Sequence, residues 1–282
     1  MSARPAPLPA APAIGQASKA RERPGAPKAS ILAVTSGKGG VGKTFFSANL
    51  AAALARRGER VLVLDADLGL ANLDVVLNLF PKVTLHDVLT GKATLEQAIL
   101  PAPGGFSALL AGSGLVEYSR LTPQVRDQLS EIILQLVPRF DRILLDTGAG
   151  ISDVVLHAVS LADEVLVVVT PEPTSMTDAY ATIKVLATLQ KRRHVRLVVN
   201  QVSAAGEGRT IRNQLQLVVD RFVAPQLKAE GDSVPLVLEL LGEIPIDPAV
   251  REAVGKRALL LVTMPGAPAA TALTATAARL AG

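Results

Sequence analysis

The stretch that decides the fold is Gly37-Lys38-Gly39-Gly40-Val41-Gly42-Lys43-Thr44. It follows a short apolar run at 31–34 and precedes an alanine-rich run at 45–57, so it connects a predicted strand to a predicted helix. The spacing G-x-x-x-x-G-K-T is typical of a phosphate-binding loop, whose backbone N–H groups surround phosphates at a helix N-terminus. In such a loop Lys43 contacts the β- and γ-phosphates, and the Thr44 hydroxyl binds Mg²⁺.

A second motif overlaps the first. The loop glycines also satisfy G-x-G-x-x-G, and Asp65 follows roughly 20 residues later, where an acid that binds a ribose is expected. A dinucleotide site is therefore an alternative interpretation. The Lys43-Thr44 pair and the second lysine, Lys38, favour a triphosphate with Mg²⁺ instead. A glycine turn without a ligand would explain the glycines but not the lysines.

Three carboxylates are placed to hold the metal. Asp65 and Asp67 follow the buried run 60–64, and Asp146 follows the run 142–145 in the position of a Walker B aspartate. The carboxyl ends of parallel strands lie at one edge of a sheet, so these side chains are expected close to the loop. Carboxylates there can bind Mg²⁺ and orient an attacking water. The expected metal site is Thr44, Asp65, Asp67 and Asp146.

From about residue 31 to its end, the chain resembles the MinD/ParA family of ATPases. The segment 38–44 is similar to that family's deviant Walker A motif, whose first lysine, here Lys38, reaches across a homodimer interface to the partner's phosphates. The resemblance also implies that Asp67 orients the attacking water, that Asn200 hydrogen-bonds adenine, and that the loop with Pro245 and Asp247 covers the base. The expected ligands are ATP and Mg²⁺. The expected catalytic residues are Lys38, Lys43 and Asp67, and the expected nucleotide contacts are residues 37–44, Asn200, Pro245 and Asp247.

One segment resembles a single branch of this family. Asp146-Thr147-Gly148-Ala149-Gly150-Ile151-Ser152 is similar to the FlhG (FleN) branch, whereas MinD and ParA usually carry D-T-P here. FlhG-type proteins control flagellar number or placement with an SRP-type GTPase called FlhF. The resemblance therefore implies an ATP-gated dimerisation switch with that role. The alternatives are a MinD-type division-site regulator, a ParA-type partition ATPase, and a nucleotide-gated scaffold that does not hydrolyse ATP.

Composition narrows the function classes further. The chain has no cysteine, which excludes disulfides, thiolate metal sites and Fe–S clusters. Its formal net charge is +4, and residues 1–30 account for all of it with five basic residues against one acidic residue. The remainder is neutral, with 24 basic and 24 acidic residues. No specific nucleic-acid partner is therefore expected.

The N-terminal segment differs from the rest of the chain. Residues 1–29 contain six prolines and few large apolar side chains, which predicts a disordered, basic, Pro-rich tail ahead of an ATPase domain at 30–282. Within the tail, Gln16-Ala17-Ser18-Lys19-Ala20-Arg21 resembles the D-Q-A-x-x-L-R activator motif of the FlhG branch, but Gly15 and Ala20 depart from it. The resemblance implies an FlhF-type GTPase as partner. A solvated linker is the alternative.

Apolar runs alternate with helical patterns, among them helices expected at 95–99 and 207–230 and a strand at 195–199 that ends at Asn200. This predicts a single doubly wound α/β domain with a mostly parallel sheet of seven or eight strands and helices on both faces. The helix at 267–280 lacks the basic and large apolar residues of a membrane anchor, so we expect it to pack on the sheet. No run of about 18 uncharged apolar residues occurs. We expect a cytoplasmic protein, with any membrane contact peripheral and at the inner face of the cell membrane.

Overall fold

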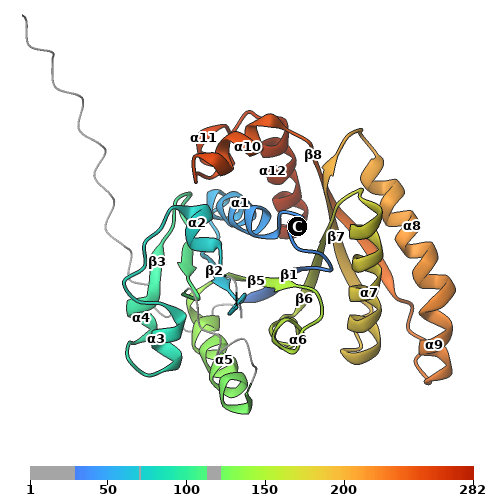
Figure 1. Ribbon diagram of the computed structural model, residues 1–282, viewed down its shortest axis with the longest axis horizontal. Coiled ribbons are helices and arrows are strands. Elements are labelled where there is room, and N and C mark those ends of the chain that lie inside the picture. Colours follow the sequence, from blue (N-terminus) through green and yellow to red (C-terminus); the bar gives the residue numbers. More distant parts are fainter. Residues whose placement is uncertain (1–28, 70, 113–121) are drawn as a thin grey trace, which may run out of the picture.

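The computed structural model describes residues 29–69, 71–112 and 122–282. Within these ranges the chain forms one α/β domain with helices on both sides of a central sheet (Figure 1). This confirms the predicted fold class. The predicted tail, apart from its last residue, and the activator-like segment at 16–21 lie outside the described residues.

The described strands form one eight-stranded sheet in the order β3-β4-β2-β5-β1-β6-β7-β8. All neighbours are parallel except β3, which is antiparallel to β4. The phosphate loop therefore begins near the middle of the sheet, at the end of β1, with β5 and β6 on either side. The strands are β1 Ser30–Ser36, β2 Val61–Asp65, β3 Ile99–Pro101, β4 Ser107–Leu109, β5 Arg142–Ala149, β6 Glu164–Val169, β7 His194–Val202 and β8 Val237–Pro245.

Each face of the sheet carries its own aliphatic core, because successive strand residues point to opposite faces. In β1, Ile31 and Ala33 belong to one core, and Leu32 and Val34 belong to the other. The first core is covered by α3 Leu85–Leu89, α4 Leu95–Ala98, α5 Pro123–Leu136, α6 Asp153–Ser160, α7 Pro173–Leu189, α8 Glu207–Phe222 and α9 Ala224–Ala229. The second is covered by α1 Lys43–Arg56, α2 Leu73–Leu77, α10 Pro248–Gly255, α11 Leu260–Thr263 and α12 Pro268–Ala281.

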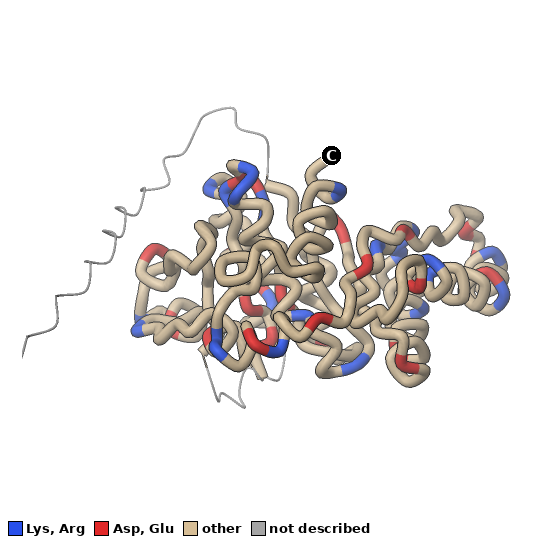
Figure 2. Tube along the Cα trace, turned by 90° about the horizontal axis from the view of Figure 1, so that it is seen from above, with Lys and Arg blue, Asp and Glu red and all other residues tan. Residues whose placement is uncertain are grey.

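The last helix behaves as the sequence predicts. Leu273, Ala277 and Leu280 of α12 are buried, and the helix lies against β8 and α1. None of the helices in the described ranges combines the length and the apolar composition that crossing a bilayer requires. Lysine and arginine are interspersed with aspartate and glutamate along the described chain (Figure 2).

Several predicted boundaries are wrong. The helix expected at 207–230 is divided into α8 and α9, and Pro225 lies in the first turn of α9, where its missing N–H removes no intrahelical bond. The helix expected at 95–99 ends at Ala98, and the next three residues form the edge strand β3. Strand β5 continues through Asp146, and β7 continues through Asn200, so neither residue ends its strand.

Candidate functional site

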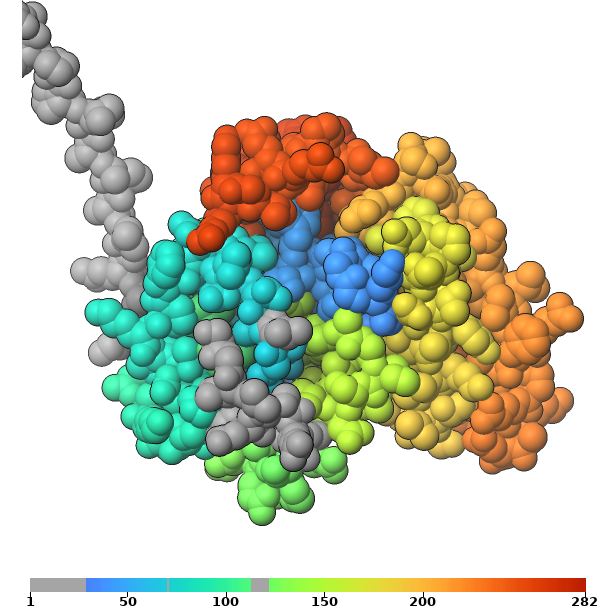
Figure 3. Space-filling view, in the orientation of Figure 1, coloured from blue at the N-terminus to red at the C-terminus, as the bar shows by residue number. Residues whose placement is uncertain are grey.

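The phosphate-loop segment lies at the carboxyl edge of the sheet, between β1 and α1. In Figure 3 it is the blue surface region bordered by the C-terminal helices in red and by the lime residues that follow β5. Gly42 is the N-cap of α1, and its φ of 93° lies in the left-handed region that favours glycine. In α1, which is described throughout, no side chain caps the N-terminus and the first turn holds no acid. This helix end is therefore suited to an anion.

The start of the loop is attached to α7 at two places. A Cβ atom at Gly37 would lie 2.2 Å from the backbone of Asp178, so only glycine allows this close approach. The Lys38 ammonium is 2.7 Å from a Glu172 carboxylate oxygen and donates to the Thr174 hydroxyl at 2.9 Å. Gly37 is therefore needed for packing, and Lys38 is directed toward α7.

Lys43 lies within the loop's own framework. Its ammonium donates to the Ser36 hydroxyl at 2.9 Å, and that hydroxyl donates to the Lys38 carbonyl at 2.7 Å. Burial lowers the pKa of Lys43, while the carboxylates of Asp146 and Asp67 act in the opposite direction. A partly desolvated ammonium held at a fixed place gains from an incoming anion such as a phosphate.

The register of the sheet brings the predicted carboxylates together. Asp65 on β2 is the direct neighbour of Asp146 on β5. Burial raises the pKa of Asp146 to about 6, although hydrogen bonds from Thr44 and Ser47 and the charge of Lys43 lower it. The Ser47 hydroxyl donates to Asp146 at 2.8 Å. Asp146 is therefore a deeply buried acid that contacts Thr44 and Ser47 in the first part of α1.

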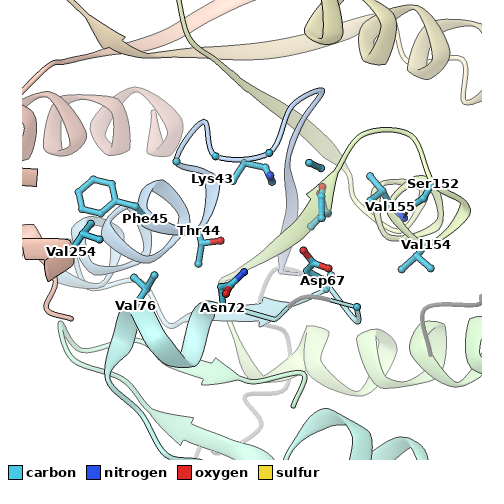
Figure 4. Close-up of a pocket in the computed structure, with 18 residues that line it drawn as sticks. Lys43, Thr44, Phe45, Asp67, Asn72, Val76, Ser152, Val154, Val155 and Val254 are labelled. Atoms are coloured by element: carbon cyan, nitrogen blue, oxygen red, sulfur yellow. Dashed lines mark hydrogen bonds between the residues drawn. The ribbon is translucent and has the colours of Figure 1, made fainter. Parts of the chain in front are cut away.

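Asp65 and Asp67 occupy different environments. Asp65 is 1% exposed, and its carboxylate accepts the N–H groups of Asp67 at 3.1 Å and Leu73 at 3.4 Å. Burial and, to a lesser extent, the charge of Asp146 raise the pKa of Asp65 well above its ordinary value. Its oxygens thus hold the turn between β2 and α2. Asp67 instead lines the open cleft (Figure 4).

The donor set suits magnesium. The Thr44 hydroxyl and the carboxylates of Asp67 and Asp146 are hard oxygen ligands, and Asp146 is a buried anion that a cation would stabilise. Within the described residues, no three histidine or acidic side chains converge as a complete metal cage. Mg²⁺ usually takes one or two carboxylates together with substrate phosphates and water, so the arrangement fits it.

A cleft of about 620 Å³ extends across this edge of the sheet. That volume is in the range of small-molecule sites. Figure 4 shows Lys43 and Thr44 near its centre, Asp67 and the start of α6 on one side, and Phe45 and Val254 on the other. The predicted residues that line the cleft are Gly39, Gly40, Gly42, Lys43, Thr44 and Asp67.

The residues expected to bind adenine are engaged within the protein. The Asn200 amide donates to the Val41 carbonyl at 2.8 Å, and its oxygen accepts the N–H of Gln201. The two carboxylate oxygens of Asp247 accept N–H groups of Ala249 and Ala269, which lie in the first turns of α10 and α12. Pro245 ends β8 and lies outside the cleft lining. A direct contact of these three residues with the base stays a prediction.

Sequence reasoning missed several residues of the site. Ser47 lies one helical turn after Thr44, so helical spacing could have placed it near Asp146. Phe45 follows the Lys-Thr pair directly, a position that could have marked it as a cleft residue. The pairing of Glu172 with Lys38 and the presence of Val254 in the cleft depend on contacts between distant segments, for which the sequence carries no local signal.

Comparisons with known proteins agree with this geometry. Residues 32–260 match the CobQ/CobB/MinD/ParA nucleotide binding domain. The antiactivator FleN of Pseudomonas aeruginosa is 42% identical over 250 residues, which are 89% of this chain and 85% of FleN. The flagellum site-determining protein YlxH of Helicobacter pylori is 35% identical over 196 residues, covering 69% and 65% of the two chains. The septum site-determining protein MinD of Pyrococcus horikoshii, solved with Mg-ADP, superposes with a TM-score of 0.67 at 29% identity, covering 89% and 96%.

The family match covers most of the chain, and the phosphate loop lies at the edge of the sheet where the family pattern requires it. This excludes the dinucleotide and glycine-turn interpretations of the loop. The chain therefore belongs to the CobQ/CobB/MinD/ParA family of nucleotide-binding domains, as a P-loop ATPase that resembles its FleN/FlhG branch.

Proposed function

We propose that this ATPase is a Mg²⁺-dependent switch whose ATP-bound form is a homodimer, and that it controls flagellar number or placement. Similarity to FleN and YlxH supports the flagellar role. Control of the division site is the second candidate, supported by the structural similarity to MinD. Both roles require a protein that changes its surface when it binds and hydrolyses ATP.

In this proposal each residue of the site has a distinct role toward the bound nucleotide. The N-terminus of α1 and Lys43 hold the phosphates, and Thr44 with Asp146 holds the magnesium ion. A magnesium ion held there would neutralise negative charge on the phosphates. Asp67 lines the cleft beside Gly148, and from there it orients the attacking water. Asp65 acts through the backbone by fixing the turn that carries Asp67.

The observation that carries the dimer proposal is the position of Lys38. This lysine belongs to the phosphate loop, yet it is absent from the lining of its own cleft. Its side chain is 37% exposed and is paired with Glu172, itself 63% exposed. An exposed ion pair of this kind is weak, on the order of 0–1 kcal/mol, so little free energy opposes its release. Lys38 is thus free to exchange Glu172 for the phosphates of a second protomer.

Light scattering of the purified protein with Mg-ATP tests the dimer. We expect the wild-type mass to double on addition of ATP, and Lys38→Ala to bind ATP yet stay monomeric. Lys184→Ala is the matched control, because Lys184 is an exposed lysine on α7 and should dimerise normally. Dimerisation of Lys38→Ala at wild-type ATP concentrations would exclude the role given to Lys38.

We also propose that the N-terminal tail acts on an FlhF-type GTPase, on the strength of the Gln16–Arg21 resemblance alone. A glutamine can orient an attacking water, and an arginine can neutralise phosphate charge. A peptide of residues 10–26 should then accelerate GTP hydrolysis by the cognate GTPase, and the same peptide with Gln16→Ala should not. No acceleration at saturating peptide would reduce the segment to a linker and leave the ATPase proposal intact.

A further inference from the structure

Ser47 is a buried hydroxyl on the side of α1 that carries Thr44. It lies three residues after Thr44, so the two side chains share the helix face that is turned toward β5. Ser47 is 0% exposed, and its hydroxyl donates to a carboxylate oxygen of Asp146 at 2.8 Å. Asp146 is 2% exposed and also accepts a hydrogen bond from the Thr44 hydroxyl. Two hydroxyls of one helix therefore contact the same buried carboxylate.

Ser47 has a closer acceptor that it does not use. A serine or threonine hydroxyl inside a helix can donate to the carbonyl four residues earlier. Thr182 in α7 and Thr276 in α12, both buried, donate in this way at 3.0 and 2.8 Å. A hydroxyl has one hydrogen, so Ser47 cannot donate to Asp146 and to the Lys43 carbonyl at the same time. Because Ser47 could be satisfied within α1, its bond to β5 serves the carboxylate.

The carboxylate gains a fixed orientation from this bond. Asp146 and Thr44 are the two residues placed to hold the magnesium ion, and Thr44 also lines the cleft. Ser47 lies outside the cleft lining, behind Thr44 along the helix, so it is placed to act on the carboxylate and not on the ligand. Groups that hydrogen-bond a metal-binding carboxylate orient it and raise the affinity of the site for the metal.

We propose that Ser47 is a positioning residue of the magnesium site, whose hydroxyl holds the Asp146 carboxylate in the orientation that binds the ion. The inference rests on the proposed Mg²⁺-dependent nucleotide site and adds a residue that acts through Asp146. The bond is made to a charged acceptor inside the protein, where charge-assisted hydrogen bonds are strong and water does not compete. Ser47 therefore contributes to metal affinity without contacting the metal.

A titration with Mn²⁺ tests the proposal, with free Mn²⁺ measured by electron paramagnetic resonance. Mn²⁺ takes the same oxygen ligands as Mg²⁺, and the protein is saturated with ADP so that no turnover occurs. We expect Ser47→Ala to bind Mn²⁺ roughly 10- to 100-fold more weakly than the wild type. Ser47→Thr keeps the hydroxyl and should bind Mn²⁺ within about threefold of the wild type. The control Ser130→Ala removes a hydroxyl that donates within α5, and should match the wild type.

Two further measurements separate positioning from a general effect on the fold. Calorimetry of ADP in the presence of EDTA reports the phosphate loop without the metal, and Ser47→Ala should match the wild type within about twofold there. Asp146→Asn removes the charge through which Ser47 is proposed to act. Adding Ser47→Ala to Asp146→Asn should then weaken Mn²⁺ binding no further, because residues that act through one another are not additive.

Each outcome has a defined meaning. Wild-type Mn²⁺ affinity in Ser47→Ala would overturn the inference and leave the magnesium site in place. Equal losses of Mn²⁺ and of metal-free ADP would show that Ser47 only supports the loop, and would overturn it as well. The same holds if Ser47→Thr binds Mn²⁺ as weakly as Ser47→Ala. A wild-type ADP complex that binds no Mn²⁺ would instead contradict the proposed function.

Discussion

The two edges of the central sheet treat charge in opposite ways. At the amino edge, where the parallel strands begin, charged groups are paired: Arg60 with Asp141 at 2.7 Å, Arg142 with Glu59 at 2.8 Å, and Arg196 with Glu164. At the carboxyl edge, Lys43, Asp65 and Asp146 lie close together, and burial is the largest cause of each pKa shift. The same strands therefore carry paired charges at their amino ends and buried charges with shifted pKa values at their carboxyl ends.

The charges at the two edges therefore contribute differently to the stability of the nucleotide-free protein. Paired charges at the amino edge fix the strand starts, whereas buried charges at the carboxyl edge are unfavourable until a ligand compensates them. Strongly perturbed pKa values cluster at functional sites. Substitutions at the carboxyl edge should therefore impair nucleotide binding more than stability, and substitutions at the amino edge should do the reverse.

The largest expected effect is at the carboxyl edge. Lys43→Ala removes the ammonium that meets the β- and γ-phosphates, and ATP affinity should fall at least about 100-fold, as expected for losing charge-assisted bonds to phosphate. The free energy of unfolding should drop by less than about 1 kcal/mol, because burial disfavours the charged form of Lys43 in the folded protein and offsets its attraction to Asp146 and Asp67. Calorimetry and urea unfolding measure the two quantities. A large loss of stability with normal ATP affinity would contradict the account, because it would show that Lys43 serves the fold and not the ligand.

Asp146→Asn should separate function from stability. The pKa of Asp146 in the folded protein, about 6, exceeds its ordinary value of 3.8, so the folded state binds the proton more tightly than the unfolded state. The contribution is therefore fully favourable below pH 3.8 and is lost as the pH rises through 6. At pH 7.5 the penalty is at most on the order of 3 kcal/mol, because each pKa unit is worth about 1.4 kcal/mol.

The nucleotide-free Asp146→Asn protein should consequently be more stable than the wild type at pH 7.5, with the gain shrinking toward pH 4. ATP turnover should fall at least about tenfold, because an amide is a poorer magnesium ligand than a carboxylate. Urea unfolding at several pH values measures the stability difference. A variant less stable than the wild type at pH 7.5 would show that Asp146 is stabilised by its hydrogen bonds more than it is penalised by burial.

The smallest effect is expected at the amino edge. Arg142→Ala leaves Glu59, whose side chain is 20% exposed, without its partner, and should lower the free energy of unfolding by about 1–3 kcal/mol. ATP affinity should change less than about twofold, because the pair lies at the opposite end of the strand. The control Lys256→Ala breaks an exposed pair with Glu252 and should change stability by less than about 0.5 kcal/mol. A loss of ATP affinity in Arg142→Ala would show that the two edges are coupled.

Local patterns predicted the parts of the molecule that depend on neighbouring residues. The phosphate loop and the buried strands follow from spacing and composition within short segments. The meeting of Asp65 with Asp146 also followed, since parallel strands align their carboxyl ends.

The residue pairings that the sequence did not predict depend on contacts between distant segments. Lys38 and Glu172 are separated by 134 positions, and the bond between Asn49 and Leu261 spans 212. The resemblance assigned the attacking water to Asp67, but residue types alone placed Asp65 at the metal as well. The backbone of the β2–α2 turn encloses Asp65 and leaves Asp67 in the cleft. Patterns in the sequence identify residue types for a role, but the turn geometry and long-range partners determine which atoms are exposed.

The central claim, that Lys38 acts across a dimer, is tested most directly by mixing two inactive variants. Lys38→Ala keeps Asp67 but offers no lysine, and Asp67→Ala offers Lys38 but orients no water. If Lys38 acts in trans, each mixed dimer has one complete site, because Lys38 of the Asp67→Ala protomer reaches the intact site of the other protomer across a two-fold symmetric interface. An equimolar mixture should then hydrolyse ATP well above the rate of either variant alone. If Lys38 acts within its own protomer, no site in any dimer is complete. Turnover no higher than that of the separate variants would then contradict the account.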